Sequence, residues 1–154
     1  MNKVSIRTAT VADIETVATN NAAMAAETEG RRLDPETLRT GVRRVLADPT
    51  RGVYYLAELD GSVVGQLLIT REWSDWRDGW FWWIQSVFVA PEARRTGVYR
   101  VLHEHVVAEA RRAGDVCGIR LYTERANTRA QQVYEQMGMT RSAYVMYEAD
   151  WSKE

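Results

Sequence analysis

The stretch Val87-Phe-Val-Ala-Pro-Glu-Ala-Arg-Arg-Thr-Gly-Val-Tyr-Arg-Val-Leu102 joins a short apolar run to a basic turn and then to an amphipathic segment. The apolar run is typical of a strand end, and apolar residues at helical spacing after the turn predict a helix from about Thr96 to Arg112. A helix N-terminus carries unpaired amides and a partial positive charge, and it therefore suits an anionic phosphate group.

The turn itself adds to this phosphate-binding character. Gly97 lets the chain curl and lets a ligand approach the backbone. Arg94, Arg95 and Arg100 supply positive charge. On charge alone, the alternative of a basic helix cap on a solvated surface is equally good. The chain contains neither G-x-x-x-x-G-K-[ST] nor G-x-G-x-x-G, which argues against a nucleoside triphosphatase and against a dinucleotide fold.

Upstream of this stretch, caps and turns divide the chain into elements. A capping box at Thr10-Val-Ala-Asp13 begins one helix, which Gly30 ends, and Asp34-Pro35-Glu36 begins a second. Asp60-Gly61 between two β-rich runs predicts a hairpin. The expected strands are 4–7, 53–59, 63–70 and 80–89, with a loop at 72–79.

Downstream, the pattern predicts a strand at 117–123, a short helix at 127–137 closed by Gly138, and a last strand at 143–148. The order is therefore β-α-α-β-β-β-α-β-α-β. It predicts an α/β (α+β) fold in one domain over residues 1–154, with a mixed, mostly antiparallel sheet flanked by helices.

Composition narrows the function. The net charge of -1 argues against nucleic acid and against an anionic membrane surface as partners. The lone Cys117 allows no intrachain disulfide and favours a cytoplasmic protein, and its apolar neighbours predict a buried thiol in preference to a nucleophile. His103 and His105 stand two apart on a predicted helix, on different faces, so we expect no metal.

Residues Arg94-Arg95-Thr96-Gly97-Val98-Tyr99 resemble the [Q/R]-x-x-G-x-[G/A] motif of the GNAT superfamily of acetyltransferases. The resemblance implies that amides from about Arg95 to Arg100 hold the pyrophosphate of acetyl-CoA. It also implies that the backbone of Val87, Phe88 and Val89 pairs with the pantetheine arm, at a bulge. The last motif position is usually Gly or Ala, so the Tyr99 ring must point away from the phosphates.

A second match is Asn127 followed by Tyr134-Glu-Gln-Met-Gly-Met139, which resembles the family's Asn and Tyr-x-x-x-Gly-[Phe/Met]. The resemblance assigns Asn127 to the cofactor arm and Tyr134 to the sulfur of the leaving thiolate, where a proton donor is needed. Read without the resemblance, Tyr134 is a core-facing helix aromatic.

The acceptor side is less defined. Some relatives carry a glutamate on the strand before the pyrophosphate turn, and here the corresponding residues, Trp83 and Gln85, cannot act as a base. Other candidate bases are Glu27, Glu29, Glu72, Asp75 and Glu124. The resemblance implies that the end of the first helix, with Glu27 and Glu29, forms one wall of the acceptor site. In the loop at 72–79 and just after it, Glu72, Asp75 and Asp78 alternate with Trp73, Trp76 and Trp80, and carboxylates beside aromatic faces suit a cationic amine. We expect Glu27, Glu29, Trp73, Trp83 and Gln85 to line the acceptor site. The alternative for these residues is a solvated helix end and an exposed loop.

The resemblance thus implies an N-acetyltransferase that moves an acetyl group from acetyl-CoA to a primary amine of a small molecule or peptide, by direct attack in a ternary complex. A strand amide near Phe88 or Val89 is the expected oxyanion donor. The alternative function is an acyl-CoA-binding regulatory module with weak or no catalysis. The sequence leaves open whether the protein is a monomer or a homodimer.

Overall fold

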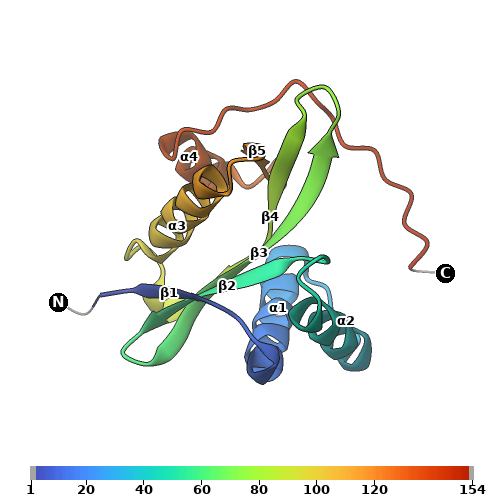
Figure 1. Cartoon of the computed structure of the whole chain (residues 1–154). Coiled ribbons are helices and arrows are strands. Elements are labelled where there is room, and N and C mark those ends of the chain that lie inside the picture. Colours follow the sequence, from blue (N-terminus) through green and yellow to red (C-terminus); the bar gives the residue numbers. More distant parts are fainter. Residues whose placement is uncertain (1–2, 153–154) are drawn as a thin grey trace. The chain divides into compact units, whose positions relative to one another are not determined.

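The structure is a computed structural model and describes residues 3–152. Its elements, in chain order, are β1 (Ser5–Thr8), a 3-10 turn (Val11–Asp13), α1 (Ile14–Glu29), α2 (Pro35–Ala47), β2 (Val53–Leu59), β3 (Ser62–Ser74), β4 (Gly79–Val89), a second 3-10 turn (Pro91–Ala93), α3 (Val98–Ala113), β5 (Val116–Arg120) and α4 (Thr128–Gln136) (Figure 1). The chain divides into two units, one ending at Leu121 and one starting at Tyr122, and each is described by itself.

The first unit contains a five-stranded sheet in the order β1-β2-β3-β4-β5. The pairs β1–β2, β2–β3 and β3–β4 are antiparallel, and the pair β4–β5 is parallel. A parallel pair needs a crossover connection, and α3 supplies it. The predicted mixed, mostly antiparallel sheet with flanking helices is therefore confirmed.

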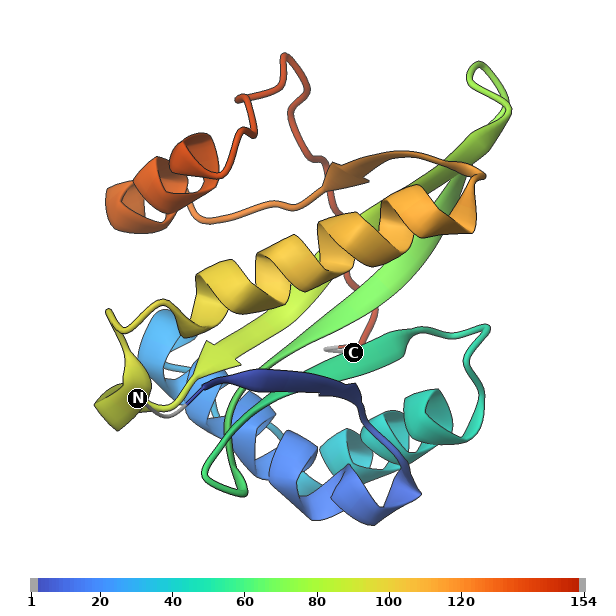
Figure 2. The same cartoon turned by 60° about the vertical axis from the view of Figure 1, so that its left-hand side comes forward.

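Two apolar clusters lie on opposite faces of this sheet. On one face, α3 contributes Val98, Leu102 and Val106 to a core that includes Leu67, Ile69 and Ile84 of the sheet. On the other face, α1 and α2 pack over Tyr54, Leu56 and Leu68. In Figure 2, α3 lies along one side of the sheet, and α1 and α2 lie together on the other side. Alternate residues of β3 and β4 therefore face different helices.

The predicted caps account for where the helices begin and end. The Asp13 carboxylate accepts a hydrogen bond from the Thr10 amide at 2.8 Å, which completes the capping box ahead of α1. Gly30 ends α1 in the left-handed region, with φ of 58°. The Asp34 side chain accepts from the Thr37 amide at 2.9 Å at the start of α2. These short-range signals fixed both boundaries of α1 and the start of α2.

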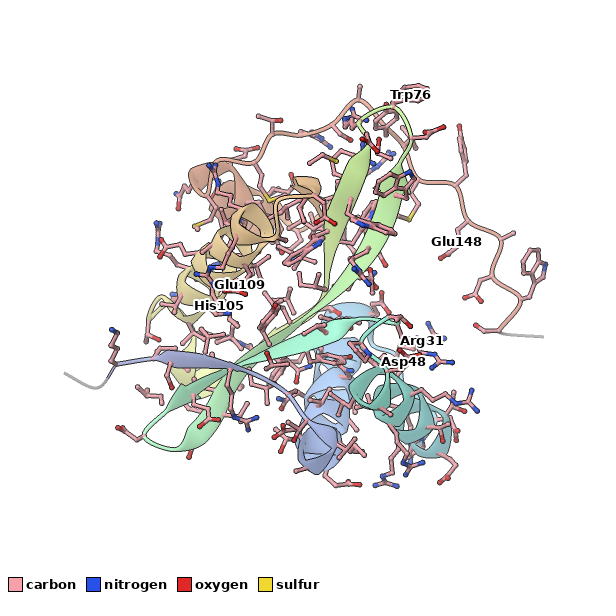
Figure 3. All side chains as sticks on the ribbon, viewed as in Figure 1. Arg31, Asp48, Trp76, His105, Glu109 and Glu148 are labelled. Carbon is pink, nitrogen blue, oxygen red and sulfur yellow. The ribbon has the colours of Figure 1, made fainter. Side chains whose placement is uncertain are left out.

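The β3–β4 hairpin is longer than predicted. Both strands continue past the expected ends, so Glu72 and Trp73 lie in β3 and not in a loop, and Trp76 lies at the exposed tip (Figure 3). The rings of Trp73 and Trp80 meet edge to face, with centroids 4.9 Å apart, across this extension. Cross-strand aromatic pairs of this kind stabilise a ladder, which explains why the pairing persists.

Two further expectations were wrong. Cys117 is exposed on β5, because β5 is the edge strand of the sheet in the first unit. The predicted last strand at 143–148 does not form: residues 141–152 contain no helix or strand. The residues at 143–148 have the composition of a strand, but a strand forms only where its backbone hydrogen-bonds to a neighbouring strand, and composition does not supply that neighbour. The second unit thus contributes only α4 as regular structure among its described residues.

Within residues 3–152, no helix has the length and apolar content needed to cross a membrane. The expectation of a single domain over residues 1–154 stays a prediction.

Candidate functional site: the basic turn and the open edge of β4

The basic turn between β4 and α3 has two residues in the left-handed region. Arg95 has φ of 64° and Gly97 has φ of 89°. The Thr96 hydroxyl donates to the carbonyl of Ala93 at 2.5 Å, which closes the turn from within. Successive amides in a turn with such alternating backbone angles point into one concavity and bind anions. The turn therefore has the backbone shape expected of a phosphate site.

The start of α3 adds three amides to this turn. The first bond inside the helix runs from the Val101 amide to the Gly97 carbonyl at 3.1 Å. The amides of residues 98–100 accordingly precede this bond and belong to the first turn of the helix, whose amides point out of its N-terminus. The helix dipole gives this end a partial positive charge.

A close backbone approach holds α3 against the sheet. Gly65 of β3 lies directly beneath Val98, and a Cβ at Gly65 would lie 2.8 Å from Cγ1 of Val98. Val98 is almost fully buried in the core on this face. The position of the Arg95–Gly97 turn, which leads directly into Val98, therefore depends on the missing side chain of Gly65.

The three arginines of the turn differ in their partners. The Arg94 guanidinium donates to Glu27 of α1 at 2.6 Å and to the Val89 carbonyl at 2.9 Å. Arg100 lies 3.8 Å from Glu104, in a loose pair on the exposed face of α3. Arg95 is exposed. Arg94 thus ties the end of β4 to the end of α1, and the contact of Arg95 and Arg100 with a phosphate stays a prediction.

The side chain of Tyr99 is directed away from the Arg95–Gly97 turn. Its hydroxyl lies 3.1 Å from Nδ1 of His103, and the two rings meet edge to face. His103 is buried, and burial lowers its pKa below the ordinary value despite the opposing charge of Glu104. Nδ1 of the neutral ring can then accept a hydrogen bond from the Tyr99 hydroxyl. The ring of Tyr99 is directed along α3, so a bulky residue is accommodated where the family has Gly or Ala.

The end of β4 has an unpaired edge. The pairing with β5 covers Trp80 to Trp83 and no further among the described residues. On its other side β4 remains paired with β3, and the Ala90 amide donates to the Val64 carbonyl at 2.8 Å. Amides alternate in direction along a strand, so Phe88 also faces β3, whereas Val87 and Val89 face the open edge.

A bulge interrupts β4 just before this edge. The register with β3 changes between Gln66 and Leu68, where β4 has one residue more than β3. The extra residue is Ser86 or its neighbour, and Ser86 has φ of 49°. The bulge lies at the start of the predicted 87–89 segment.

The predicted acceptor residues fall into two groups. Trp83 donates from Nε1 to Glu72 at 3.1 Å, and Gln85 donates to the Thr70 hydroxyl at 2.5 Å, on the sheet face that α1 and α2 cover. Trp73 pairs with Trp80 and points to the opposite face. The structure therefore does not bring Trp73 together with Trp83 and Gln85.

The candidate bases of the first unit are largely engaged. Glu27 pairs with Arg94, and Glu72 accepts from Arg120 at 2.8 Å as well as from Trp83. Glu29 is the exposed last residue of α1. Asp75 lies in the turn at the hairpin tip.

The second unit carries three predicted residues, of which Glu124 is exposed and precedes α4. Asn127 caps α4, because its Oδ1 accepts from the Ala130 amide at 3.1 Å. Tyr134 is half-buried in the same helix, and burial raises the pKa of its phenol. A raised pKa keeps the hydroxyl protonated at neutral pH, as a proton donor requires.

Sequence reasoning missed a buried polar cluster on the α1 face of the sheet. Gln66, Asn21 and Tyr54 are buried and hydrogen-bonded to one another through Asn21. A signal for it was present, since Gln66 is the one polar side chain in the apolar run from Val63 to Ile69.

Among residues 3–152, no group of three or more His, Cys, Asp or Glu side chains is arranged to hold a metal ion.

The fold and the turn geometry define a class of protein that known structures share. A structure described as a possible acetyltransferase from Clostridium difficile 630 has 39% sequence identity and a TM-score of 0.89, covering 96% of this chain and 97% of that one. A ribosomal-protein-alanine N-acetyltransferase from Brucella melitensis biovar Abortus 2308 shares the fold, with 17% identity, a TM-score of 0.77 and coverage of 97% and 99%. So does a "predicted acetyltransferase with acetyl-CoA" from Clostridium acetobutylicum, with 17% identity, a TM-score of 0.77 and coverage of 99% of both chains.

A comparison with models of protein families gives the same result. The model of the Acetyltransferase (GNAT) family matches residues 14–139, and the chain belongs to that family. No protein of curated function matches the chain.

Proposed function

We propose that the protein is an N-acetyltransferase that moves the acetyl group of acetyl-CoA to a primary amine by direct attack in a ternary complex. The observation that carries the proposal is the turn at Arg95–Gly97, where two left-handed residues precede the first amides of α3 at the end of β4, a backbone pattern that suits an anion. The fold shared with the acetyl-CoA complex from Clostridium acetobutylicum supports the same ligand.

The turn and the strand edge have separate parts in this proposal. Amides from Arg95 to Arg100 bind the pyrophosphate, with Arg95 and Arg100 adding charge. Arg94 acts through the position of the turn, because Glu27 and the Val89 carbonyl already hold its guanidinium. The pantetheine arm pairs with the outward-facing backbone of Val87 and Val89, beside Phe88, as an added strand would. Asn127 contributes the Nδ2 group that its capping role leaves unused.

In the reaction, the amine nitrogen attacks the thioester carbonyl carbon and forms a tetrahedral oxyanion. An amide on the open edge of β4, that of Val89 or Val87, donates to this oxygen. The sequence indicated Phe88 or Val89 as the expected oxyanion donor. Phe88 is left out of this proposal, because amides alternate along the strand and its amide faces β3. The carbon–sulfur bond then breaks, and the thiolate takes a proton from the Tyr134 hydroxyl.

The attacking amine must also lose a proton. Glu27 and Glu72 are engaged in ion pairs, so neither accepts a proton without breaking one. We assign this proton to water, with Trp83, Gln85, Glu27 and Glu29 as walls of the acceptor site. Holding both reactants in place supplies much of the acceleration.

The proposal also includes a cytoplasmic location, because the single Cys117 allows no intrachain disulfide.

The test compares Tyr134→Phe with the wild type, by thiol release from acetyl-CoA over a panel of primary amines. We expect the variant to bind CoA like the wild type and to turn over about a hundredfold more slowly, the size of effect typical of a lost proton donor. Equal rates would remove Tyr134 from the mechanism. CoA binding without turnover of any amine by the wild type would instead favour the acyl-CoA-binding regulatory module.

A further inference from the structure

A chain of side-chain amides crosses the buried interface between α1 and the sheet. The Gln66 side chain is fully buried, and its Nε2 donates to Oδ1 of Asn21 at 2.8 Å. Its Oε1 accepts from Nδ2 of Asn20 at 3.0 Å. Asn21, itself 5% exposed, donates onward to the Tyr54 hydroxyl at 3.0 Å. These hydrogen-bonded side chains therefore link α1 to β2 and β3 inside an otherwise apolar core.

This polar chain ends at the bulge in β4. Nε2 of Gln66 lies 3.5 Å from the Ser86 carbonyl. The Ser86 side chain also hydrogen-bonds to Tyr54. Burial raises the pKa of Tyr54, and the hydrogen bonds from Asn21 and Ser86 act in the opposite direction. Ser86 is thus contacted from inside the protein through both its backbone and its side chain.

The backbone of Ser86 needs this support. Its φ of 49° places a non-glycine residue in the left-handed region, which costs free energy and persists only where the surroundings hold it. A bulge also leaves the groups of its extra residue without ladder partners. A buried network whose members are all satisfied fixes one arrangement of the elements it joins.

We infer that Gln66 and Asn21 are positioning residues that hold the Ser86 bulge, so that the backbone of Val87 and Val89 faces the open edge of β4 and receives the pantetheine arm. The inference rests on the proposed function. It separates two parts of the ligand site, because the network touches the bulge and does not touch the Arg95–Gly97 turn.

The test measures the binding of two ligands by calorimetry. CoA carries both the pyrophosphate and the pantetheine arm, whereas 3′-phosphoadenosine 5′-diphosphate carries the adenosine and the phosphates without the arm. In Gln66→Met, which keeps the length of the side chain, we expect CoA affinity to fall about tenfold, as for one or two lost hydrogen bonds to the arm. The affinity for the truncated ligand should change less than twofold.

Two further variants make the result specific. Tyr54→Phe keeps the ring and removes only the hydroxyl that meets Asn21 and Ser86, so it tests the same idea if Gln66→Met does not fold. It should weaken CoA binding and spare the truncated ligand. Val17→Ala is the control for general destabilisation, because Val17 is fully buried in α1 outside the network. It should leave both affinities unchanged.

Unchanged CoA affinity in Gln66→Met and Tyr54→Phe would overturn the inference, and so would an equal loss for both ligands. A wild-type protein that binds neither ligand would overturn the proposed function itself, which is a distinct result.

Discussion

The Tyr99 hydroxyl lies 3.1 Å from Nδ1 of His103, one turn further along α3. This contact directs a large aromatic ring along the helix, although the Tyr99 Cα belongs to the first turn of α3, beside the proposed phosphate site. The family motif tolerates tyrosine here because only the backbone of the residue faces the turn.

Tyr99→Ala is expected to lower the free energy of unfolding by about 2 kcal/mol. The variant loses a half-buried ring and one hydrogen bond, and it leaves His103 without that partner. Urea denaturation followed by far-UV circular dichroism measures the change. A marked gain in CoA affinity on removing the ring would contradict the orientation described, since it would mean that the ring obstructs the turn.

The buried His103 predicts a pH dependence of stability. Its pKa is lowered below the ordinary 6.5 by burial, so the unfolded chain binds the proton more readily than the folded one. The contribution of neutral, buried His103 to the free energy of unfolding is fully present above pH 6.5. It should be lost as the pH falls from 6.5 toward the lower pKa of His103 in the folded state. The free energy of unfolding, measured across this range, should fall less steeply in His103→Gln than in the wild type. Parallel curves would show that His103 does not contribute.

Gly65→Ala is expected to weaken CoA binding about tenfold or more. The added Cβ would lie 2.8 Å from Val98, so α3 must shift and carry the phosphate turn with it. Gly41→Ala is the matched control, because Gly41 lies in α2 with no atom within 4 Å of the new Cβ. The control should gain about 0.5–1 kcal/mol of stability from helix propensity. Wild-type CoA affinity in Gly65→Ala would show that this contact does not set the site.

The ion pair between Glu27 and Arg94 should contribute little to stability. Both side chains are about two-fifths exposed, at 42% and 43%, and water screens their interaction. A double-mutant cycle with Glu27→Gln and Arg94→Gln should give a coupling free energy of about 0.2–1 kcal/mol that decreases at high salt. A salt-independent coupling several times larger would indicate that the pair is a structural anchor.

The elements that the sequence predicted well are those set by nearby residues. Thr10 and Asp13 bond to each other's backbone within one turn, and Asp34 caps its helix three residues away. Such contacts depend on spacing alone, so a local pattern reveals them. The tail at 143–148 failed because a strand also needs a partner, which no local pattern supplies.

The same limit applies to the candidate site. The turn at Arg94–Arg100 could be read from its glycine and its charges. The alternation that turns Trp73 away from Trp83 could not, because it depends on the register between β3 and β4. Gln66 likewise looked like an isolated polar residue until the fold brought Asn21 and Ser86 to it from separate elements.

The extended β3–β4 hairpin also has a spectroscopic consequence. Five of the six tryptophans lie between residues 73 and 83, so intrinsic fluorescence reports mainly on this hairpin. The edge-to-face indoles of Trp73 and Trp80, 4.9 Å apart, are close enough for exciton coupling in the ultraviolet circular dichroism spectrum. Fluorescence and far-UV signals should therefore coincide during denaturation only if the hairpin melts together with the rest of the sheet. The protein thus carries its own probe for whether that hairpin is an independent unit of unfolding.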